Sequence, residues 1–482
     1  MSAVLGVFGP PPTYAGAGRM LARMARRGSA AVDVHRAPGA LLAVARHGWE
    51  TAAHLGGPAE VAADRAVCVA ADAALYHRRD LLRALAEAGV RAGGDSAAAL
   101  ILAAYRAWGT RCAERLEGDF AFVLWDAHAR RAVCARDFAG KRPLVYAALP
   151  DTLVAASTPG GVLEHPACPD ALDLVTLAET AAGLWAGSDA TAFRAIRTLP
   201  AGHTLVAEEG GIRVDRHWTP PRMGSAPTPA FDEAAEALRE RLIAATAERL
   251  APDAPAAVWM SGGWDSTAVL ASGAVARLRA GGDPPEIVSV SHPPGDPGRE
   301  DEIIARVARR WKRPVRWLRI ADIPLFERIR ESAAERDEPF GHVFEAWNRA
   351  LVARSRKLGA RVALDGNGGD QLFFTSNLYL ADLLREGRWR TLWREWKAKG
   401  GTDPRDLFQY AVQPLLPPWV VDGLGWLRGR PLRPTMERPL PPWIEPGFAR
   451  RHGLAARERA HSPRPPGAGA AEREAYWYLT AP

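Results

Sequence analysis

The residues most clearly suited to chemistry are Ser261-Gly262-Gly263-Trp264-Asp265-Ser266, here called the first loop, which follow an apolar run and open a helical pattern. The glycines let the backbone turn tightly and present N–H groups to an anion, and a helix N-terminus adds partial positive charge. Ser261 and Ser266 add hydroxyl donors. The Asp265 carboxylate would repel a bare phosphate, so its presence predicts a Mg²⁺ ion that bridges it to the phosphates. The loop lacks the lysine of a Walker A motif, so phosphoryl transfer is not favoured.

A second glycine-rich segment, Asp365-Gly366-Asn367-Gly368-Gly369-Asp370, is called the second loop, and its last residue lies 105 positions after Asp265. Its three glycines imply that the backbone approaches a ligand closely. Asp370 is placed to supply a second Mg²⁺ ligand facing Asp265. Either loop alone could be a helix start with packing glycines, but the pair predicts a site for Mg²⁺ and phosphate.

Alternating strands and helices are expected to position these loops. The sequence predicts strands at 256–260, 287–291, 315–318 and 362–365, and helices at 265–279, 301–311, 323–334 and 343–357. Such alternation indicates a parallel sheet with right-handed crossovers, whose ligands bind outside the carboxyl ends of the strands. We therefore assign nucleotide contacts to Ser261, Gly262, Gly263, Asp265, Ser266, Ser289, Ser291, Asp365, Gly366, Gly368 and Gly369.

Several polar residues before the second loop could act as a general base: Glu335, Asp337, Glu338, His342 and Glu345. We single out His342 and Glu345 as catalytic candidates, because a spacing of three lets them share one helix face. The alternative is that they are exposed charges at the start of a helix.

The first half of the chain has a different texture, with short strands at 4–8 and 66–71 and a hairpin formed by 120–126 and 131–137. Helical patterns near 13–26, 79–89 and 96–107 interrupt these strands, which indicates an α+β domain. A proline-rich linker follows at 216–231, and Asp232 can N-cap a helix that runs through Leu250. The predicted domains are therefore 1–215 and 232–482.

The composition of the chain excludes several classes of protein. With 48% hydrophobic residues over 482 positions, the chain can build packed cores and is not disordered throughout. A net charge of +7 is mild for this length, which argues against nucleic acid as a partner. The spacing of its four cysteines supports neither a disulfide framework nor a zinc site. With no signal peptide and no apolar run long enough for a membrane span, we expect a cytoplasmic protein.

The paired loops resemble those of class B asparagine synthetases, and residues 116–126 and 135–144 resemble the glutaminase-type domain of the same enzymes. The resemblance covers roughly residues 4–380. It implies an N-terminal Ntn-hydrolase-like αββα domain and a C-terminal parallel-sheet domain of the adenine nucleotide α-hydrolase type. It also implies ATP and Mg²⁺, with ATP split into AMP and pyrophosphate.

Two departures from the family bear on function. The family's glutaminase uses a cysteine directly after the initiator Met, where this chain has Ser2. The family's N-G-E stretch, which holds glutamine, is matched here by Asp72-Ala73-Ala74. Losing both the nucleophile and the substrate clamp predicts a structural remnant, although an N-terminal serine nucleophile is an alternative. The amine must then come from a source other than glutamine.

Two kinds of relative fit a synthetase without glutaminase: β-lactam synthetases and lasso peptide cyclases. The middle of the second loop carries Glu in asparagine synthetases and Tyr in β-lactam synthetases, whereas here it is Asn367. The form G-N-G-G-D-Q-L-F and the run 378–389 look most like lasso peptide cyclases. This resemblance implies that a core peptide is the substrate, with a leader-binding protein and a leader peptidase as partners. The alternatives are a small-molecule ligase, such as a β-lactam synthetase or an ammonia-dependent asparagine synthetase, and a non-catalytic ATP-binding scaffold.

Residues 378–399 read as one helix in which Trp389, Trp393 and Trp396 share a face among basic residues. The stripe is either buried or a platform for a peptide or its partner. The resemblance also implies a catalytic lysine in a helical region after the second loop, and no residue here matches it convincingly. We expect either that this lysine has moved or that the chain is shortened.

Overall fold

The computed structural model describes residues 2–48, 57, 60–64, 66–184, 187, 189–221, 229–251, 254–326, 329–339, 344–373, 376–427, 440–460 and 469–480. Its contacts divide the chain into two units. The first comprises 1–173, 189–218 and 229–367, and the second comprises 174–188, 219–228 and 368–482. The first unit contains segments of both predicted domains, whose limits at 215 and 232 stay predictions. In these described ranges, no helix is long and apolar enough to cross a membrane.

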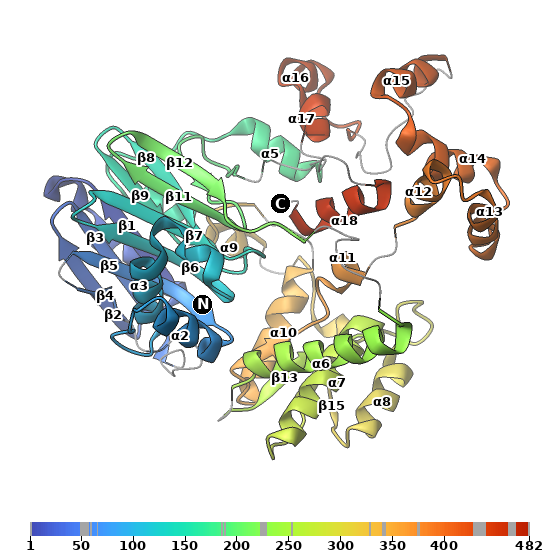
Figure 1. Ribbon diagram of the computed structural model, residues 1–482, viewed down its shortest axis with the longest axis horizontal. Helices are drawn as coiled ribbons and strands as arrows, with labels where there is room; N and C mark the ends of the chain where they lie inside the picture. Colours follow the sequence, from blue (N-terminus) through green and yellow to red (C-terminus); the bar gives the residue numbers. More distant parts are fainter. Residues whose placement is uncertain are drawn as a thin grey trace. The chain divides into compact units, whose positions relative to one another are not determined.

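Two six-stranded antiparallel sheets form the amino-terminal part of the first unit (Figure 1). The first sheet, in the order β10-β8-β9-β1-β3-β2, consists of β1 (Ala3–Phe8), β2 (Ala31–Ala37), β3 (Ala40–Arg46), β8 (Val145–Leu149), β9 (Thr152–Ala156) and β10 (Arg197–Thr198). The second, in the order β12-β11-β7-β6-β5-β4, consists of β4 (Ala62–Ala63), β5 (Val67–Leu75), β6 (Gly118–Asp126), β7 (Arg131–Arg136), β11 (His203–Glu208) and β12 (Gly211–Arg216). β6 and β7 confirm the predicted hairpin.

The two sheets pack face to face with helices outside, which confirms the αββα layering. In β1, Val4 lies in the core between the sheets, whereas Leu5 faces the opposite side, toward α1 (Ala17–Arg23) and α4 (Pro159–Leu163). Helices α2 (Arg78–Glu87) and α3 (Ala97–Trp108) cover the outer face of the second sheet. The helical pattern predicted near 13–26 contains α1, which the left-handed Gly16 (φ 91°) separates from a preceding 3-10 turn.

A four-stranded parallel sheet forms the other part of the first unit. Its order is β15-β14-β13-β16, with β13 (Ala256–Trp259), β14 (Glu286–Ser291), β15 (Val315–Arg319) and β16 (Val362–Leu364). The chain proceeds outward from β13 through β14 to β15 and then returns to the other side of β13 as β16. The strand order therefore reverses between β13 and β16, which is the place where parallel sheets bind ligands.

Helices cover both faces of this sheet, as the alternation predicts. Helices α7 (Trp264–Arg279) and α8 (Asp301–Arg310) pack on the face that carries Val258, and α10 (Glu345–Lys357) packs on the face that carries Ala257. Helix α6 (Phe231–Arg249) packs beside α7. The predicted N-cap at Asp232 is wrong: Ala230 holds that position, and Asp232 lies in the first turn, where a carboxylate favours the helix dipole. Between β15 and α10, helix α9 covers only Ile329–Ala334.

The second unit consists mainly of short helices. They are α5 (Leu174–Ala181), α11 (Gly369–Phe373), α12 (Tyr379–Arg385), α13 (Trp389–Ala398), α14 (Pro404–Leu407), α15 (Pro418–Leu427), α16 (Pro446–Arg451), α17 (Leu454–Ala460) and α18 (Ala470–Thr480). The single helix predicted over 378–399 is wrong, because Gly387 adopts a left-handed φ of 70° and separates α12 from α13. Of the aromatic stripe, Trp396 is buried, whereas Trp389 and Trp393 are 63% and 54% exposed.

Candidate active site

The first loop leaves the carboxyl end of β13 and opens helix α7, as predicted. Its internal order comes from Ser266, whose buried Oγ accepts a hydrogen bond from Ser261 N–H at 3.1 Å and lies 3.0 Å from Ser261 Oγ. The Thr267 hydroxyl donates to Gly263 O at 2.8 Å. These contacts fix the loop as a tight turn at a helix N-terminus, a geometry that favours anions.

The second loop touches the first at the point where the strand order reverses. A Cβ added to Gly366 would lie 2.8 Å from Ser266 N and 3.0 Å from Asp265 Cβ. Real Cβ atoms essentially never approach backbone atoms that closely, so only glycine fits here without a shift of the first loop. The two motifs thus meet within the first unit, at the carboxyl ends of adjacent strands β13 and β16.

Asp365 shapes the start of the second loop from within. One of its carboxylate oxygens accepts a hydrogen bond from Asn367 N–H at 3.0 Å, and the other lies 3.2 Å from Asn367 Nδ2. Asp365 therefore holds a turn and orients the Asn367 amide. Its predicted role in nucleotide binding stays a prediction.

The predicted hydroxyl contacts from β14 have partners of their own. The buried Ser289 hydroxyl donates to Met260 O at 2.7 Å and so secures the residue that precedes the first loop. The Ser291 hydroxyl donates to Asp301 Oδ2 at 2.6 Å and secures the start of α8. Both serines support the loops from behind, and their predicted contacts with nucleotide stay predictions.

Glu300 is a site residue that motif reasoning missed. Its Oε2 accepts a hydrogen bond from Gly262 N–H at 2.7 Å, across 38 residues of chain. No motif signals this contact, because it depends on how the segment after β14 folds back over the first loop.

The donor set of the first loop fits a magnesium ion held together with phosphates. Asp265 is partly buried, and in the described chain no hydrogen bond or ion pair engages its carboxylate. Among the described residues, no group of three or more His, Cys, Asp or Glu side chains could hold a metal by itself. Phosphate oxygens would therefore complete the coordination. Asp370, Gly368 and Gly369 belong to the second unit, so the predicted pairing of Asp370 with Asp265 stays a prediction.

The candidate bases have other partners. Glu345 forms ion pairs with Arg336 and with Arg349, the latter at 2.8 Å. Two guanidinium groups thus engage the carboxylate that would have to accept a proton. His342, the other candidate, lies outside the described residues.

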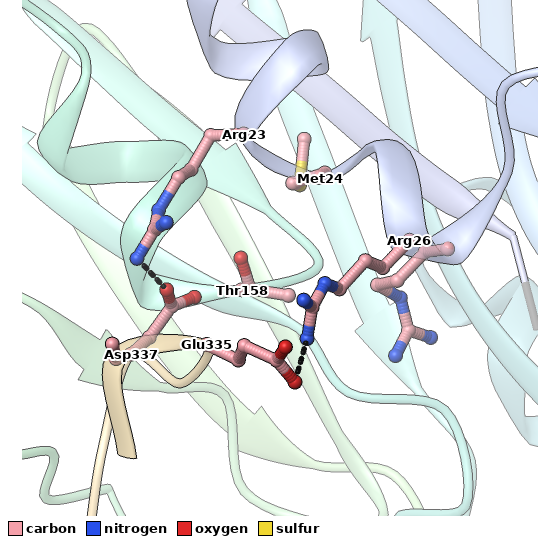
Figure 2. A pocket seen from close by; sticks show the side chains of 8 residues that line it. Arg23, Met24, Arg26, Thr158, Glu335 and Asp337 are labelled. Atoms are coloured by element: carbon pink, nitrogen blue, oxygen red, sulfur yellow. Dashed lines mark hydrogen bonds and ion pairs between the residues drawn. The ribbon is translucent and has the colours of Figure 1, made fainter. Parts of the chain in front are cut away.

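The three acidic residues before His342 instead contact helices and loops of the amino-terminal part of the first unit. Asp337 pairs with Arg23 at 2.8 Å and accepts a hydrogen bond from Gly160 N–H at 2.8 Å. Glu335 pairs with Arg26 at 2.9 Å. Figure 2 shows both ion pairs among the side chains that line a cavity. The cavity has a volume of about 240 Å³ and is lined by Arg23, Met24, Arg26, Arg27, Thr158, Ala334, Glu335 and Asp337.

Burial raises the pKa of the third carboxyl, Glu338, which accepts a hydrogen bond from Ala192 N–H at 2.8 Å. We call residues 335–338 the acidic segment. Its carboxylates anchor the polypeptide just before α10 to α1, to the turn that follows α1, to α4 and to the loop at Ala192.

Comparison with known proteins agrees with this geometry. Residues 237–480 match the asparagine synthase family, and residues 1–218 match a glutamine amidotransferase domain. The chain belongs to the asparagine synthase family. The paired loops that meet at Gly366 lie within the matched asparagine synthase region.

Individual relatives are distant in sequence. The amidase chyE of Penicillium rubens is 28% identical over 61% of this chain and 45% of its own length. Asparagine synthetase [glutamine-hydrolyzing] 3 of Bacillus subtilis is 26% identical over 46% of this chain and 36% of its own. A putative asparagine synthetase of Mycobacterium tuberculosis is 32% identical over 40% of this chain and 30% of its own. The chain thus spans less than half the length of these relatives.

Among solved structures, the glutamine phosphoribosylpyrophosphate amidotransferase of B. subtilis covers 77% of this chain and 92% of its own, at 14% identity. Its TM-score of 0.34 is too low to relate the two folds in detail.

In this member of the asparagine synthase family, the amidotransferase domain holds a closed group of charges, here called the Asp72 cluster. The Asp72 carboxylate is buried and pairs with Arg27 at 3.2 Å and with Arg142 at 3.3 Å. Burial alone would raise the pKa of Asp72, but the charges of Arg142 and Arg27 outweigh it and hold that pKa below its ordinary value. Arg27 Nε also donates to Ser2 O at 3.0 Å.

Ser2, the residue at the family's nucleophile position, is fully buried beside the Asp72 cluster. Its Oγ has no hydrogen-bond partner among the described residues, so no neighbouring group there activates it. Sequence motifs identified Ser2 and Asp72 but not the two arginines. Only the folded sheets bring Arg27 and Arg142 to the carboxylate.

The cysteines offer no replacement nucleophile. Burial raises the pKa of the Cys68, Cys112 and Cys134 thiols to about 12, and it also raises that of Cys168. Since the thiolate is the reactive form, the raised pKa values keep these thiols mainly protonated near neutral pH.

Two lysines follow Asp370 in the sequence, Lys397 and Lys399. Within the second unit, Lys399 Nζ donates to Asn377 Oδ1 at 2.5 Å, and Lys397 lies over the rings of Trp393 and Trp396. The catalytic lysine expected from the family resemblance stays a prediction without an assigned residue.

Proposed function

We propose that this protein is an ATP-dependent amide ligase that closes a macrolactam ring in a peptide, as lasso peptide cyclases do. The observation that carries the ligase chemistry is the contact of Gly366 with Ser266 and Asp265 where the strand order reverses. That contact supports one shared nucleotide site rather than two unrelated glycine-rich turns.

The reaction has two balanced steps. In the first, a side-chain carboxylate of the peptide attacks the α-phosphorus of ATP, the bond to the β-phosphate breaks, and pyrophosphate leaves. In the second, the N-terminal amine of the same peptide attacks the acyl carbon of the adenylate. The amide C–N bond forms, AMP leaves, and the amine loses a proton.

The residues of the first loop would bind and stabilise the pyrophosphate leaving group. The N–H groups of Gly262 and Gly263 and the hydroxyls of Ser261 and Ser266 would bind the β- and γ-phosphates, where charge develops as pyrophosphate departs. Mg²⁺, when bound, supplies further neutralisation of that charge. Asp265 would hold it from this unit, and Asp370 is the second proposed ligand.

A peptide amine is the proposed nucleophile because the Asp72 cluster argues against ammonia made in this chain. Its carboxylate is engaged by two arginines, and Ser2 has no activating neighbour among the described residues. In a folded-back peptide the amine is already close to the acyl group, so little catalysis beyond positioning is required.

The proposal includes partners and a setting. A leader-binding protein would deliver the precursor, and a leader peptidase would expose the amine that closes the ring. We place the reaction in the cytoplasm, where ATP is available.

Pyrophosphate release tests the proposal. The purified chain is incubated with Mg²⁺ and ATP plus candidate core peptides that have a free N-terminal amine and one Asp or Glu at a ring-closing position. We expect release that depends on the peptide, and a product lighter by one water molecule. A peptide with Asn or Gln at the acceptor position, or with an acetylated amine, is the matched control and should give no ring.

Other outcomes select the alternatives. Release stimulated by an amino acid or by ammonia, and not by peptides, would make the protein a small-molecule ligase. Nucleotide binding without pyrophosphate release under any of these substrates would make it a scaffold.

A further inference from the structure

One acidic side chain already occupies the loop proposed to hold pyrophosphate. The hydrogen bond from Gly262 N–H to Glu300 Oε2 is 2.7 Å long, and the side-chain stem covers the glycine. A Cβ on Gly262 would lie 2.7 Å from Glu300 Cβ and 2.8 Å from Glu300 Cδ. Glu300 therefore lies directly against the backbone that a phosphate would approach.

A carboxylate and a phosphate oxygen compete for such a donor, because both accept charge-assisted hydrogen bonds from backbone N–H groups. With Glu300 in place, bound phosphates would face two carboxylates, those of Glu300 and Asp265. A metal ion on Asp265 would offset one of these charges, and Glu300 would repel the phosphates unless it moved away.

The surroundings of Glu300 let its side chain move without disturbing α8. Glu300 immediately precedes that helix, but its side chain makes no capping hydrogen bond. The start of α8 is held instead by Asp301, which accepts a hydrogen bond from Ser291 at 2.6 Å and pairs with Arg299 at 3.1 Å.

We infer that Glu300 is a displaceable internal anion of the nucleotide site. It occupies the Gly262 N–H in the absence of ATP, yields that donor to a phosphate oxygen when ATP binds, and returns to it as pyrophosphate leaves. The carboxylate thereby weakens the binding of both ATP and pyrophosphate and favours product release. This inference rests on the proposed function, because it requires that the first loop binds the phosphates.

Calorimetric titration with Mg·ATP and, separately, with Mg·pyrophosphate tests the inference on the full chain. Glu300→Ala removes the competing acceptor and its charge, and we expect about tenfold tighter binding of both ligands. Glu300→Gln keeps the shape and removes only the charge, so a smaller gain of roughly threefold is expected. Glu302→Gln is the matched control, because Glu302 is exposed and lies two residues after Glu300. This variant also removes one negative charge, and its affinity for both ligands should stay within about twofold of wild type.

The sign of the change decides the outcome. Unchanged affinity in both Glu300 variants would overturn the inference, and weaker binding would make Glu300 a ligand of the metal or the nucleotide instead. If wild type and all variants fail to bind Mg·ATP while their thermal melting stays cooperative, the nucleotide site itself is wrong, and the proposed function falls with the inference. Tighter binding in the variants alone, with wild type too weak to measure, would support it.

Discussion

The Asp72 cluster and the first loop contain similar chemical groups in opposite arrangements. In the cluster, a buried carboxylate is neutralised by two guanidinium groups, and the neighbouring Ser2 hydroxyl is fully covered. In the first loop, the Asp265 carboxylate has no partner in the described chain, and Gly262 N–H is taken only by the Glu300 side chain. The comparison teaches that a site retains binding capacity when its charges can be satisfied by a ligand, and loses it when the protein satisfies them itself.

Removing the unpartnered carboxylate should have the largest effect. We expect Asp265→Ala to lower the rate of pyrophosphate release by at least about 10³-fold, or ~4 kcal/mol, because the metal ion would lose its ligand in the first loop. The rate is measured at saturating peptide and Mg·ATP. Asp283→Ala, an exposed change in the loop after α7, is the control. A rate within threefold of wild type for Asp265→Ala would contradict the metal role.

Breaking the Asp72 cluster should affect stability. Asp72→Asn leaves two largely buried guanidinium groups without their shared carboxylate, and we expect the free energy of unfolding to fall by about 3 kcal/mol. Urea titration at neutral pH measures the loss. The control is Asp80→Asn in an exposed pair with Arg83, for which the change should stay below about 1 kcal/mol.

Comparing wild type with Asp72→Asn at different pH values provides a second test of the Asp72 cluster. Because the folded-state pKa of Asp72 is lowered, its contribution is fully present above the ordinary carboxyl pKa of 3.8 and declines as the pH falls below that value. Wild type should therefore lose its advantage over Asp72→Asn in acid. A stability difference between the two that does not change between neutral pH and strong acid would be inconsistent with the ion-pair account.

Separating the two loops should have an intermediate effect. The methyl group of Gly366→Ala would have to displace Ser266 N or Asp265 Cβ, and we expect kcat/KM for ATP to fall about 30-fold, or ~2 kcal/mol. Gly282→Ala is matched, because its methyl group would meet only ordinary contacts at 3.7 Å. Equal kinetics for the two variants would show that the contact at Gly366 does not matter for catalysis.

Restoring the family's nucleophile should change almost nothing. Ser2→Cys supplies a thiol, but Asp72 remains held by Arg27 and Arg142, so we expect no glutamine hydrolysis above background. Ammonia release from glutamine is measured beside an authentic glutamine-dependent asparagine synthetase as positive control. Activity in Ser2→Cys would show that only the nucleophile is missing from this domain.

Local signals allowed much of the fold to be predicted. Apolar runs and glycines located the parallel sheet, and two apolar runs on either side of residues 127–130 located the hairpin of β6 and β7. The break between α12 and α13 was missed because helical periodicity continues through Gly387, whose left-handed conformation ends α12. The exposed Trp389 and Trp393 were likewise not predictable, since a helix face reads the same whether or not another element covers it.

The site residues also fall into those that could be predicted from the sequence and those that could not. The first and second loops could be found because their function constrains a short stretch of chain. The Gly366 contact, the Glu300 carboxylate and the arginines around Asp72 depend on side chains that folding brings together from distant positions. No local pattern records such pairings.

The contact at Gly160 has a consequence for how such a chain could be encoded. A Cβ there would lie 2.2 Å from Asp337 Oδ1, so a side chain at position 160 would have to displace the Asp337 carboxylate. The polypeptide before the segment that joins β12 to α6 and the polypeptide after it are therefore held together by specific contacts. These contacts are the close approach at Gly160 and the ion pairs of Arg23 and Arg26. Two separate genes, one for each half, should therefore yield polypeptides that assemble when expressed together, and the covalent link would then be a convenience of synthesis.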